Sequence, residues 1–176
     1  MDYWQSLSLF ARQYLRAVQV LTSANIPSEQ PDVFAVGPVY NTLGLATELT
    51  LKATLSKELG YEKEKLKQLG HDLRALYVTC DKAFDRVEFE KDVFVWAGIN
   101  LDIPNSARKH YNDIGLSENT YLHFSIQLEG LNYNYFNEPN TFERFGTRYP
   151  NSTLTAREVR VPIITYGLEK ILCRLD

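Results

Sequence analysis

Glu48 and Lys52 are the charged pair whose residue types and spacing most clearly allow chemistry. They stand one helical turn apart in an apolar segment, and on a helical projection both fall within the arc of its leucines. One interpretation is an intrahelical ion pair with the acid before the base, which adds little stability when it is exposed. The other is a desolvated pair that orients a ligand or a partner's polar group, because unneeded charge is costly to bury. Glu48 and Lys52 are therefore candidate ligand-binding residues.

The three histidines are the next candidates for acid–base chemistry. His71 precedes Asp72 at an expected helix start, where free backbone N–H groups favour anions. The alternative interpretation is local: Asp72 caps the helix, and His71 packs or bonds nearby. His110 and His123 do not share a helical face with each other or with His71 at a spacing that suits a metal. The sequence therefore predicts no metal site and no cofactor.

A short segment combines cations with aromatic rings at Arg144, Phe145, Arg148 and Tyr149. Such side chains can hold a phosphate and stack on a base, although similar groups also occur on inert surfaces. Arg144, Arg148 and Tyr149 are candidate ligand-binding residues, and Arg148 could serve catalysis with His71 or His123. Only their three-dimensional placement can decide between these roles.

The composition describes one globular domain over residues 1–176. Hydrophobic residues make up 44% of the chain and charged residues 23%. A formal net charge of -3 gives no overall positive field to recruit a phosphate polymer or an anionic membrane. Cys80 and Cys173 are far apart in sequence, which disfavours a disulfide framework. No apolar run approaches transmembrane length and no secretory signal is seen, so we expect no membrane association and a cytoplasmic location.

Apolar spacing predicts an all-α, up-and-down bundle of about five helices. The expected helices cover about residues 4–21, 39–59, 72–85, 117–135 and 162–175. The leucines of 39–59 surround the helix, so this helix should be central. Gly70 should close a short charged helical turn over 61–69, and Asp72 should cap the helix that follows. Residues 25–38 and 137–160 are expected loops, whereas 92–103 fits either a buried strand or a short helix ended by Pro104.

Two of these segments together resemble the HEPN domain family. They are Glu48-Leu49-Thr50-Leu51-Lys52-Ala53 and Leu69-Gly70-His71-Asp72-Leu73-Arg74-Ala75-Leu76. The resemblance implies that the two helices lie side by side in an up-and-down bundle. It also implies a homodimer, sometimes paired with a nucleotidyltransferase-type protein, and RNA or a nucleotide as ligand.

The ribonucleases of that family carry an Arg followed, after four to six residues, by a His. No Arg stands at that distance before His71, His110 or His123, and no His follows His123. The resemblance therefore implies a non-catalytic interaction or ligand-binding module, in a toxin–antitoxin or defence setting. The alternative is a degenerate, metal-independent ribonuclease toxin that uses His71 or His123 with Arg148.

Overall fold

The computed structural model describes residues 2–23, 31–136 and 157–176, and this part of the chain is helical without any strand. The all-α prediction is confirmed for it. The helices are α1 (Tyr3–Ser23), α2 (Pro31–Leu59), α3 (Lys63–Gln68), α4 (Leu73–Thr79), η1 (Cys80–Lys82), α5 (Arg86–Asn100), α6 (Asn105–Asp113), η2 (Glu118–Leu122), α7 (Phe124–Tyr135) and α8 (Val161–Arg174). The described residues thus hold eight α-helices, so the count of about five is not confirmed.

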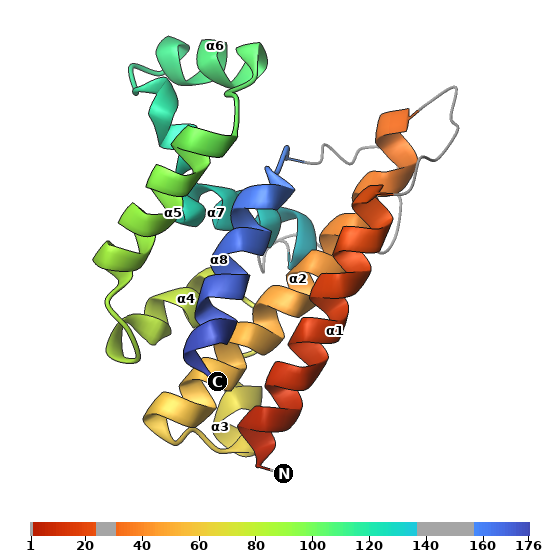
Figure 1. Cartoon of the computed structure of the whole chain (residues 1–176), viewed down its shortest axis with the longest axis vertical. Coiled ribbons are helices and arrows are strands. Elements are labelled where there is room, and N and C mark those ends of the chain that lie inside the picture. The colour runs from red at the N-terminus through yellow and green to blue at the C-terminus, as the bar shows by residue number, and fades with distance from the viewer. Residues whose placement is uncertain (1, 24–30, 137–156) are drawn as a thin grey trace.

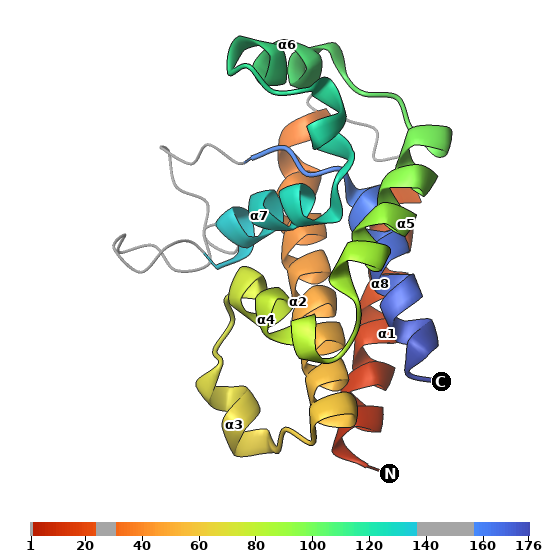
Figure 2. The same cartoon turned by 90° about the vertical axis from the view of Figure 1, so that its left-hand side faces the viewer.

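The antiparallel pair α1 and α2 runs along the long axis of the molecule, with α8 beside it (Figure 1, Figure 2). α1 turns one face to its neighbours and buries Leu7, Ser8, Ala11, Leu15 and Val18. The end of α8 is tied to both partners, because Arg12 donates to the Leu172 carbonyl at 2.8 Å and Lys57 to the Leu175 carbonyl at 2.8 Å. The predicted first and last helices are confirmed, and Pro162 lies in the first turn of α8 as expected.

α2 is the central helix, as the leucine pattern predicts. Its middle is buried around most of its circumference, and the fully buried side chains include Leu43, Leu51 and Leu55. The buried threonines remain compatible with this core because each hydroxyl donates to the carbonyl four residues earlier. These bonds run from Thr47 to Leu43, from Thr50 to Ala46 and from Thr54 to Thr50.

The predicted loop over residues 25–38 is wrong from Pro31 onward, where α2 begins. Pro31 occupies the first turn, whose backbone N–H groups have no intrahelical partner in any case. Pro38 lies inside the helix and removes one backbone hydrogen bond, yet α2 continues past it and buries Val39 and Tyr40. Tertiary packing therefore outweighs the local cost of this proline. Residues 25–30 lie outside the described part of the chain.

The turn between α3 and α4 follows the prediction. Gly70 adopts a φ of 67°, a left-handed conformation that glycine reaches without steric cost. The Asp72 carboxylate accepts from the Ala75 amide at 3.0 Å and caps α4. The helix ends at Thr79, earlier than expected, because η1 tightens the chain before a new helix begins.

That new helix, α5, lies in a region to which the sequence assigns no structure. Asp85 caps it, since its carboxylate accepts from the amides of Val87 at 2.9 Å and Glu88 at 3.0 Å. Of the two alternatives for 92–103, the helical one is correct as far as Asn100. α6 follows at the end of the molecule opposite the two termini (Figure 1).

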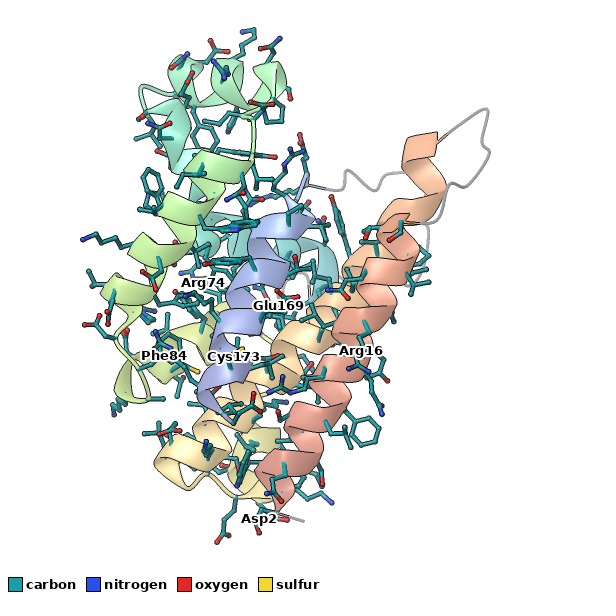
Figure 3. The ribbon with its side chains drawn as sticks, viewed as in Figure 1. Asp2, Arg16, Arg74, Phe84, Glu169 and Cys173 are labelled. Carbon is teal, nitrogen blue, oxygen red and sulfur yellow. The ribbon has the colours of Figure 1, made fainter. Side chains whose placement is uncertain are left out.

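The predicted helix over 117–135 is two elements, η2 and α7. His123 separates them in an extended conformation, with φ −75° and ψ 138°. Residues 157–160 are non-helical, as predicted, and 137–156 lie outside the description. Both cysteines are free thiols, Cys80 buried and Cys173 exposed on α8 (Figure 3). None of the described helices is both long and apolar enough to cross a membrane.

Candidate functional sites

Three side chains from different parts of the fold meet at the Glu48 carboxylate. Lys52 donates to Oε1 at 2.7 Å, and the hydroxyl of Tyr135 donates to Oε2 at 2.9 Å. Nδ1 of His71 lies 2.9 Å from the same Oε2. We call Glu48, Lys52, His71 and Tyr135 the Glu48 cluster. It joins the middle of α2 to the turn before α4 and to the end of α7.

Local sequence explains how the partners reach Glu48. Gly44 precedes Glu48 by one helical turn, and a Cβ placed there would lie 2.3 Å from the Tyr135 ring. The ring therefore packs directly on the α2 backbone, and its hydroxyl reaches the carboxylate. On the other side, the glycine turn places His71 over α2. Asn132 of α7 holds that turn by accepting from the Leu73 amide at 2.8 Å.

The carboxylate of Glu48 is ionised. Burial by itself would raise its pKa, but the hydrogen bonds from Lys52, His71 and Tyr135 and the charge of Lys52 together hold the pKa below its ordinary value. Only about 6% of the Glu48 side chain and 11% of the Lys52 side chain are exposed. The intrahelical ion pair is confirmed, and it is buried, so the small contribution expected of an exposed pair does not apply. Both carboxylate oxygens already accept hydrogen bonds from the protein itself. We therefore infer that the cluster holds α2, α7 and the turn before α4 together.

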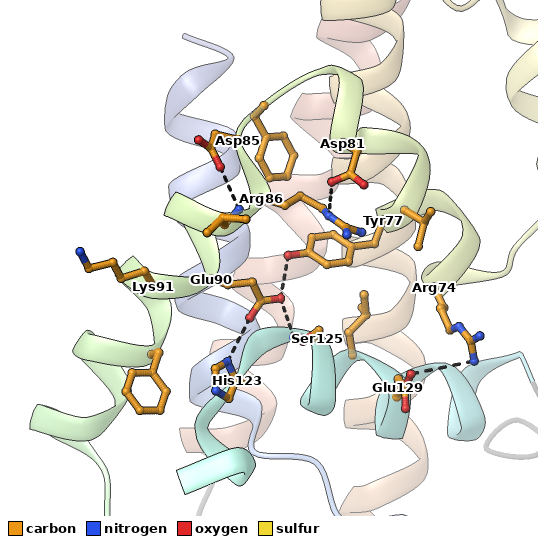
Figure 4. Close-up of a pocket in the computed structure, with 15 residues that line it drawn as sticks. Arg74, Tyr77, Asp81, Asp85, Arg86, Glu90, Lys91, His123, Ser125 and Glu129 are labelled. Atoms are coloured by element: carbon orange, nitrogen blue, oxygen red, sulfur yellow. Dashed lines mark hydrogen bonds and ion pairs between the residues drawn. The ribbon is translucent and has the colours of Figure 1, made fainter.

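A second polar site lines a groove of about 890 Å³ between α4–η1, the first half of α5 and the start of α7 (Figure 4). The side chains that give it chemical character are Tyr77, Arg86, Glu90, Phe94, His123 and Ser125. We call this the α5 groove. Tyr77 connects this groove to an aromatic core, in which the ring of Phe89 lies 5.0 Å from that of Phe124 and 6.2 Å from that of Tyr77.

Glu90 lies at the centre of the α5 groove. Its Oε1 accepts from the Tyr77 hydroxyl at 2.8 Å and from the Ser125 amide at 3.0 Å. Its Oε2 is buried and has no hydrogen-bond donor among the described residues. The closest charged partner is Nδ1 of His123, at 3.8 Å. That separation is too long for a hydrogen bond. A buried carboxylate oxygen without a hydrogen-bond donor is uncommon, and it indicates a position where a ligand could donate a hydrogen bond.

Tyr77 holds Glu90 in this position. Burial and the neighbouring Glu90 carboxylate raise the pKa of Tyr77 far above its ordinary value, so the hydroxyl keeps its proton and donates it. The guanidinium of Arg86 lies over the Tyr77 ring, 4.9 Å from its centre, and pairs with Asp81. These contacts fix one wall of the groove and leave Oε2 of Glu90 turned toward His123 (Figure 4).

The opposite wall carries a stacked ring pair. The rings of Phe94 and His123 lie 4.8 Å apart with planes 30° from parallel. About 43% of the His123 side chain is exposed, and that side chain makes no hydrogen bond to any described residue. Further along the groove, Arg74 lies 3.9 Å from Glu129, both largely exposed.

The residues that the sequence singles out do not form one site. Glu48, Lys52 and His71 lie together in the Glu48 cluster, and His123 lies in the α5 groove. Arg144, Arg148 and Tyr149 lie outside the described residues. Sequence reasoning misses Tyr77, Glu90 and Phe94 as site residues. One signal could have revealed α5, namely Asp85 followed three residues later by Glu88, a pattern that marks helix starts.

No three His, Cys, Asp or Glu side chains within residues 2–23, 31–136 and 157–176 are grouped so that they could hold a metal ion. Comparison of the chain with protein-family models, with curated proteins and with solved structures found no match.

Proposed function

We propose that the chain is a non-catalytic, HEPN-like ligand-binding module that takes a nucleotide, free or as an unpaired residue of RNA, in the α5 groove. The observation that carries this proposal is the position of the Phe94–His123 stack beside the partly buried carboxylate of Glu90, whose Oε2 is buried. Proteins bind unpaired bases by stacking them on aromatic side chains and by hydrogen bonding to their edges. The α5 groove offers both kinds of contact within one hollow.

The charges of the groove favour a single nucleotide over a long phosphate backbone. Its cations, Arg74, Arg86 and Lys91, are offset by the carboxylates of Asp81, Asp85, Glu90 and Glu129. The whole chain is likewise acidic, with a formal charge of -3. Nucleic-acid binding through many phosphates needs a continuous positive surface. Recognition here would instead rest on stacking and on hydrogen bonds to one base.

Titration calorimetry with the four ribonucleoside monophosphates tests the proposal. Phe94→Ala should weaken binding by about tenfold, because base–aromatic stacking is worth about 1–3 kcal/mol. Phe10→Ala is the matched control, since Phe10 is an exposed aromatic on α1 and does not line the groove. Equal affinity of the two variants, or no binding by the wild type, would contradict the proposal.

The family resemblance extends the proposal to the protein's setting. A homodimer, a nucleotidyltransferase-type partner, a toxin–antitoxin or defence role and a cytoplasmic location are all implied by it and stay proposals. The relation between the two resembling segments supports it, because His71 of the second contacts Glu48 of the first.

A degenerate ribonuclease is the second candidate function, and the Glu90–His123 pair favours it. A carboxylate beside an imidazole can orient it for acid–base work. Against it, no Arg stands four to six residues before His71, His110 or His123, the spacing that the ribonucleases of the resembling family carry. Incubation of labelled RNA without metal, using wild type, His71→Ala and His123→Ala, separates the two functions. Cleavage that is lost in one variant would establish the enzyme, and intact RNA throughout would exclude it.

A further inference from the structure

The imidazole of His123 occupies the place that a bound base would need. It stacks on Phe94, and one of its ring nitrogens faces Oε2 of Glu90 across 3.8 Å. A planar heterocycle with a nitrogen directed at a carboxylate is also how a base would sit in this groove. The ring of His123 is therefore a stand-in contributed by the chain itself.

Stacking on Phe94 is the main contact that the ring of His123 makes in the groove. Its side chain forms no hydrogen bond to any described residue, and its separation from Glu90 exceeds hydrogen-bonding distance. Its backbone lies in the extended junction between η2 and α7, outside the regular part of either helix. Rotation of the side chain would uncover both the face of Phe94 and Oε2 of Glu90.

The hydrogen-bonding state of Glu90 selects among bases. Oε1 already accepts from Tyr77 and Ser125, whereas Oε2 accepts from no described residue and has two lone pairs. The site therefore suits a ring that presents adjacent N–H donors and no acceptor toward the carboxylate. Among the four RNA bases, guanine does so with N1–H and its exocyclic amine. Adenine and cytosine place a ring acceptor there, and uracil flanks its N–H with carbonyl oxygens.

We propose that the α5 groove is selective for guanine, whose base displaces the His123 imidazole from Phe94 and donates to Oε2 of Glu90. This inference rests on the proposed nucleotide-binding function and adds its specificity. The exposed cations on the rim, Lys91 and Arg74, are those available to the phosphate, and Lys91 forms no ion pair with a described residue. Lys91 extends outward from α5, away from Glu90 (Figure 4).

Calorimetric titrations of the full chain with GMP, AMP, CMP and UMP test the selectivity. GMP should bind at least about tenfold more tightly than the other three, since hydrogen bonds to a charged group are worth about 1.5–3 kcal/mol. Glu90→Gln should abolish this preference, because the amide keeps an acceptor for Tyr77 and Ser125 but places a donor where Oε2 stood. Glu88→Gln, an exposed carboxylate on the same helix outside the groove, is the control.

The direction in which His123→Ala changes the affinity for GMP decides whether the imidazole is a stand-in for the base. If the imidazole is a stand-in, its removal should tighten GMP binding by at least about threefold, because the protein no longer spends most of its time in the self-occupied form. His110→Ala, which replaces a histidine outside the α5 groove, should leave the affinity unchanged. Thermal melting of each variant checks that it is folded before titration.

The outcomes separate this inference from the function on which it rests. Weaker GMP binding by His123→Ala, or equal binding of all four nucleotides by the wild type, would overturn guanine selection by displacement while leaving nucleotide binding intact. Binding of no nucleotide by either wild type or His123→Ala would overturn both. A short oligouridine with one central guanosine completes the set. Its affinity relative to GMP identifies RNA or the free nucleotide as the source of the guanine, and either result supports the proposal.

Discussion

The hydroxyl of Tyr135 donates to Oε2 of Glu48 at 2.9 Å, which links two helices through residues that lie far apart in sequence. The contact depends on Gly44, which lets the Tyr135 ring lie directly on α2. It completes the set of donors around a buried carboxylate whose other partners are Lys52 and His71. The Glu48 cluster thus stabilises the scaffold from which the α5 groove is built.

Removal of Lys52 should destabilise the protein strongly. Lys52→Ala leaves the buried Glu48 carboxylate without its cation, and breaking a buried pair from one side costs about 3–5 kcal/mol. Lys109→Ala is the matched control, because Lys109 and Asp113 form an exposed pair with the same helical spacing. The control should change the free energy of unfolding by no more than about 0.5 kcal/mol. Urea denaturation measures the free energy of unfolding of both variants. A similarly small decrease for the two would indicate that the Glu48–Lys52 pair is exposed to solvent.

Stability should fall in acid partly through Glu48. Its pKa in the folded protein lies below the ordinary value of 4.5, so the folded state holds the charged form more strongly than the unfolded chain does. The stabilisation is fully present above pH 4.5 and is lost as the pH falls through the lower folded pKa. Urea midpoints measured across this range should drop more steeply for wild type than for Glu48→Gln. Parallel profiles would show that Glu48 contributes nothing to the acid sensitivity.

Substitution of Gly44 tests the packing of Tyr135. Gly44→Ala introduces a methyl group into the space of the ring. Such overpacking should cost about 1–3 kcal/mol. Gly98→Ala offers the opposite case on α5, where the nearest outside atom lies 3.9 Å from the added Cβ. That control should be neutral or stabilising by up to about 1 kcal/mol, since alanine favours helix. Thermal melting of the two variants distinguishes them, and a neutral Gly44→Ala would refute the close approach.

The Asp72 carboxylate caps α4 by accepting from the Ala75 amide. Asp72→Ala should therefore cost on the order of 1 kcal/mol. The carboxylate also accepts from the side chain of Asn132 at 3.3 Å, so its loss loosens the contact with α7. Asp102 is an exposed carboxylate that caps no described helix. Asp102→Ala should stay within about 0.5 kcal/mol of wild type in chemical denaturation. An unchanged free energy of unfolding for Asp72→Ala would contradict the capping role of this side chain.

Strong local signals explain the parts of the fold that the sequence predicts correctly. Gly70 and Asp72 each have one conformational role that suits their residue type, and the apolar faces of α1 and α8 are regular. The leucine pattern of α2 allows burial of Glu48 and Lys52 as one of two alternatives, and the structure shows that they are buried. Pro38 favours the incorrect loop prediction. It removes one backbone hydrogen bond from α2, and the packing that outweighs this loss is seen only in the folded structure.

The α5 groove could not be predicted for a different reason. α5 buries Phe89, Val93 and Ala97 but exposes Val87 and Ile99, so its helical pattern is blurred. Without that helix, nothing places Glu90 near His123, which lies much further along the chain. The site forms where α4, α5 and α7 pack together, and the spacing of residues in the sequence does not predict that packing.

Nuclear magnetic resonance provides the most direct test that the α5 groove, and not the Glu48 cluster, binds a nucleotide. Amide spectra of the ¹⁵N-labelled full chain would be recorded during addition of GMP. We expect shift changes concentrated at residues 74–94 and 123–129, with little change around Glu48 and Lys52. An unchanged spectrum, or changes confined to residues outside the groove, would contradict this expectation.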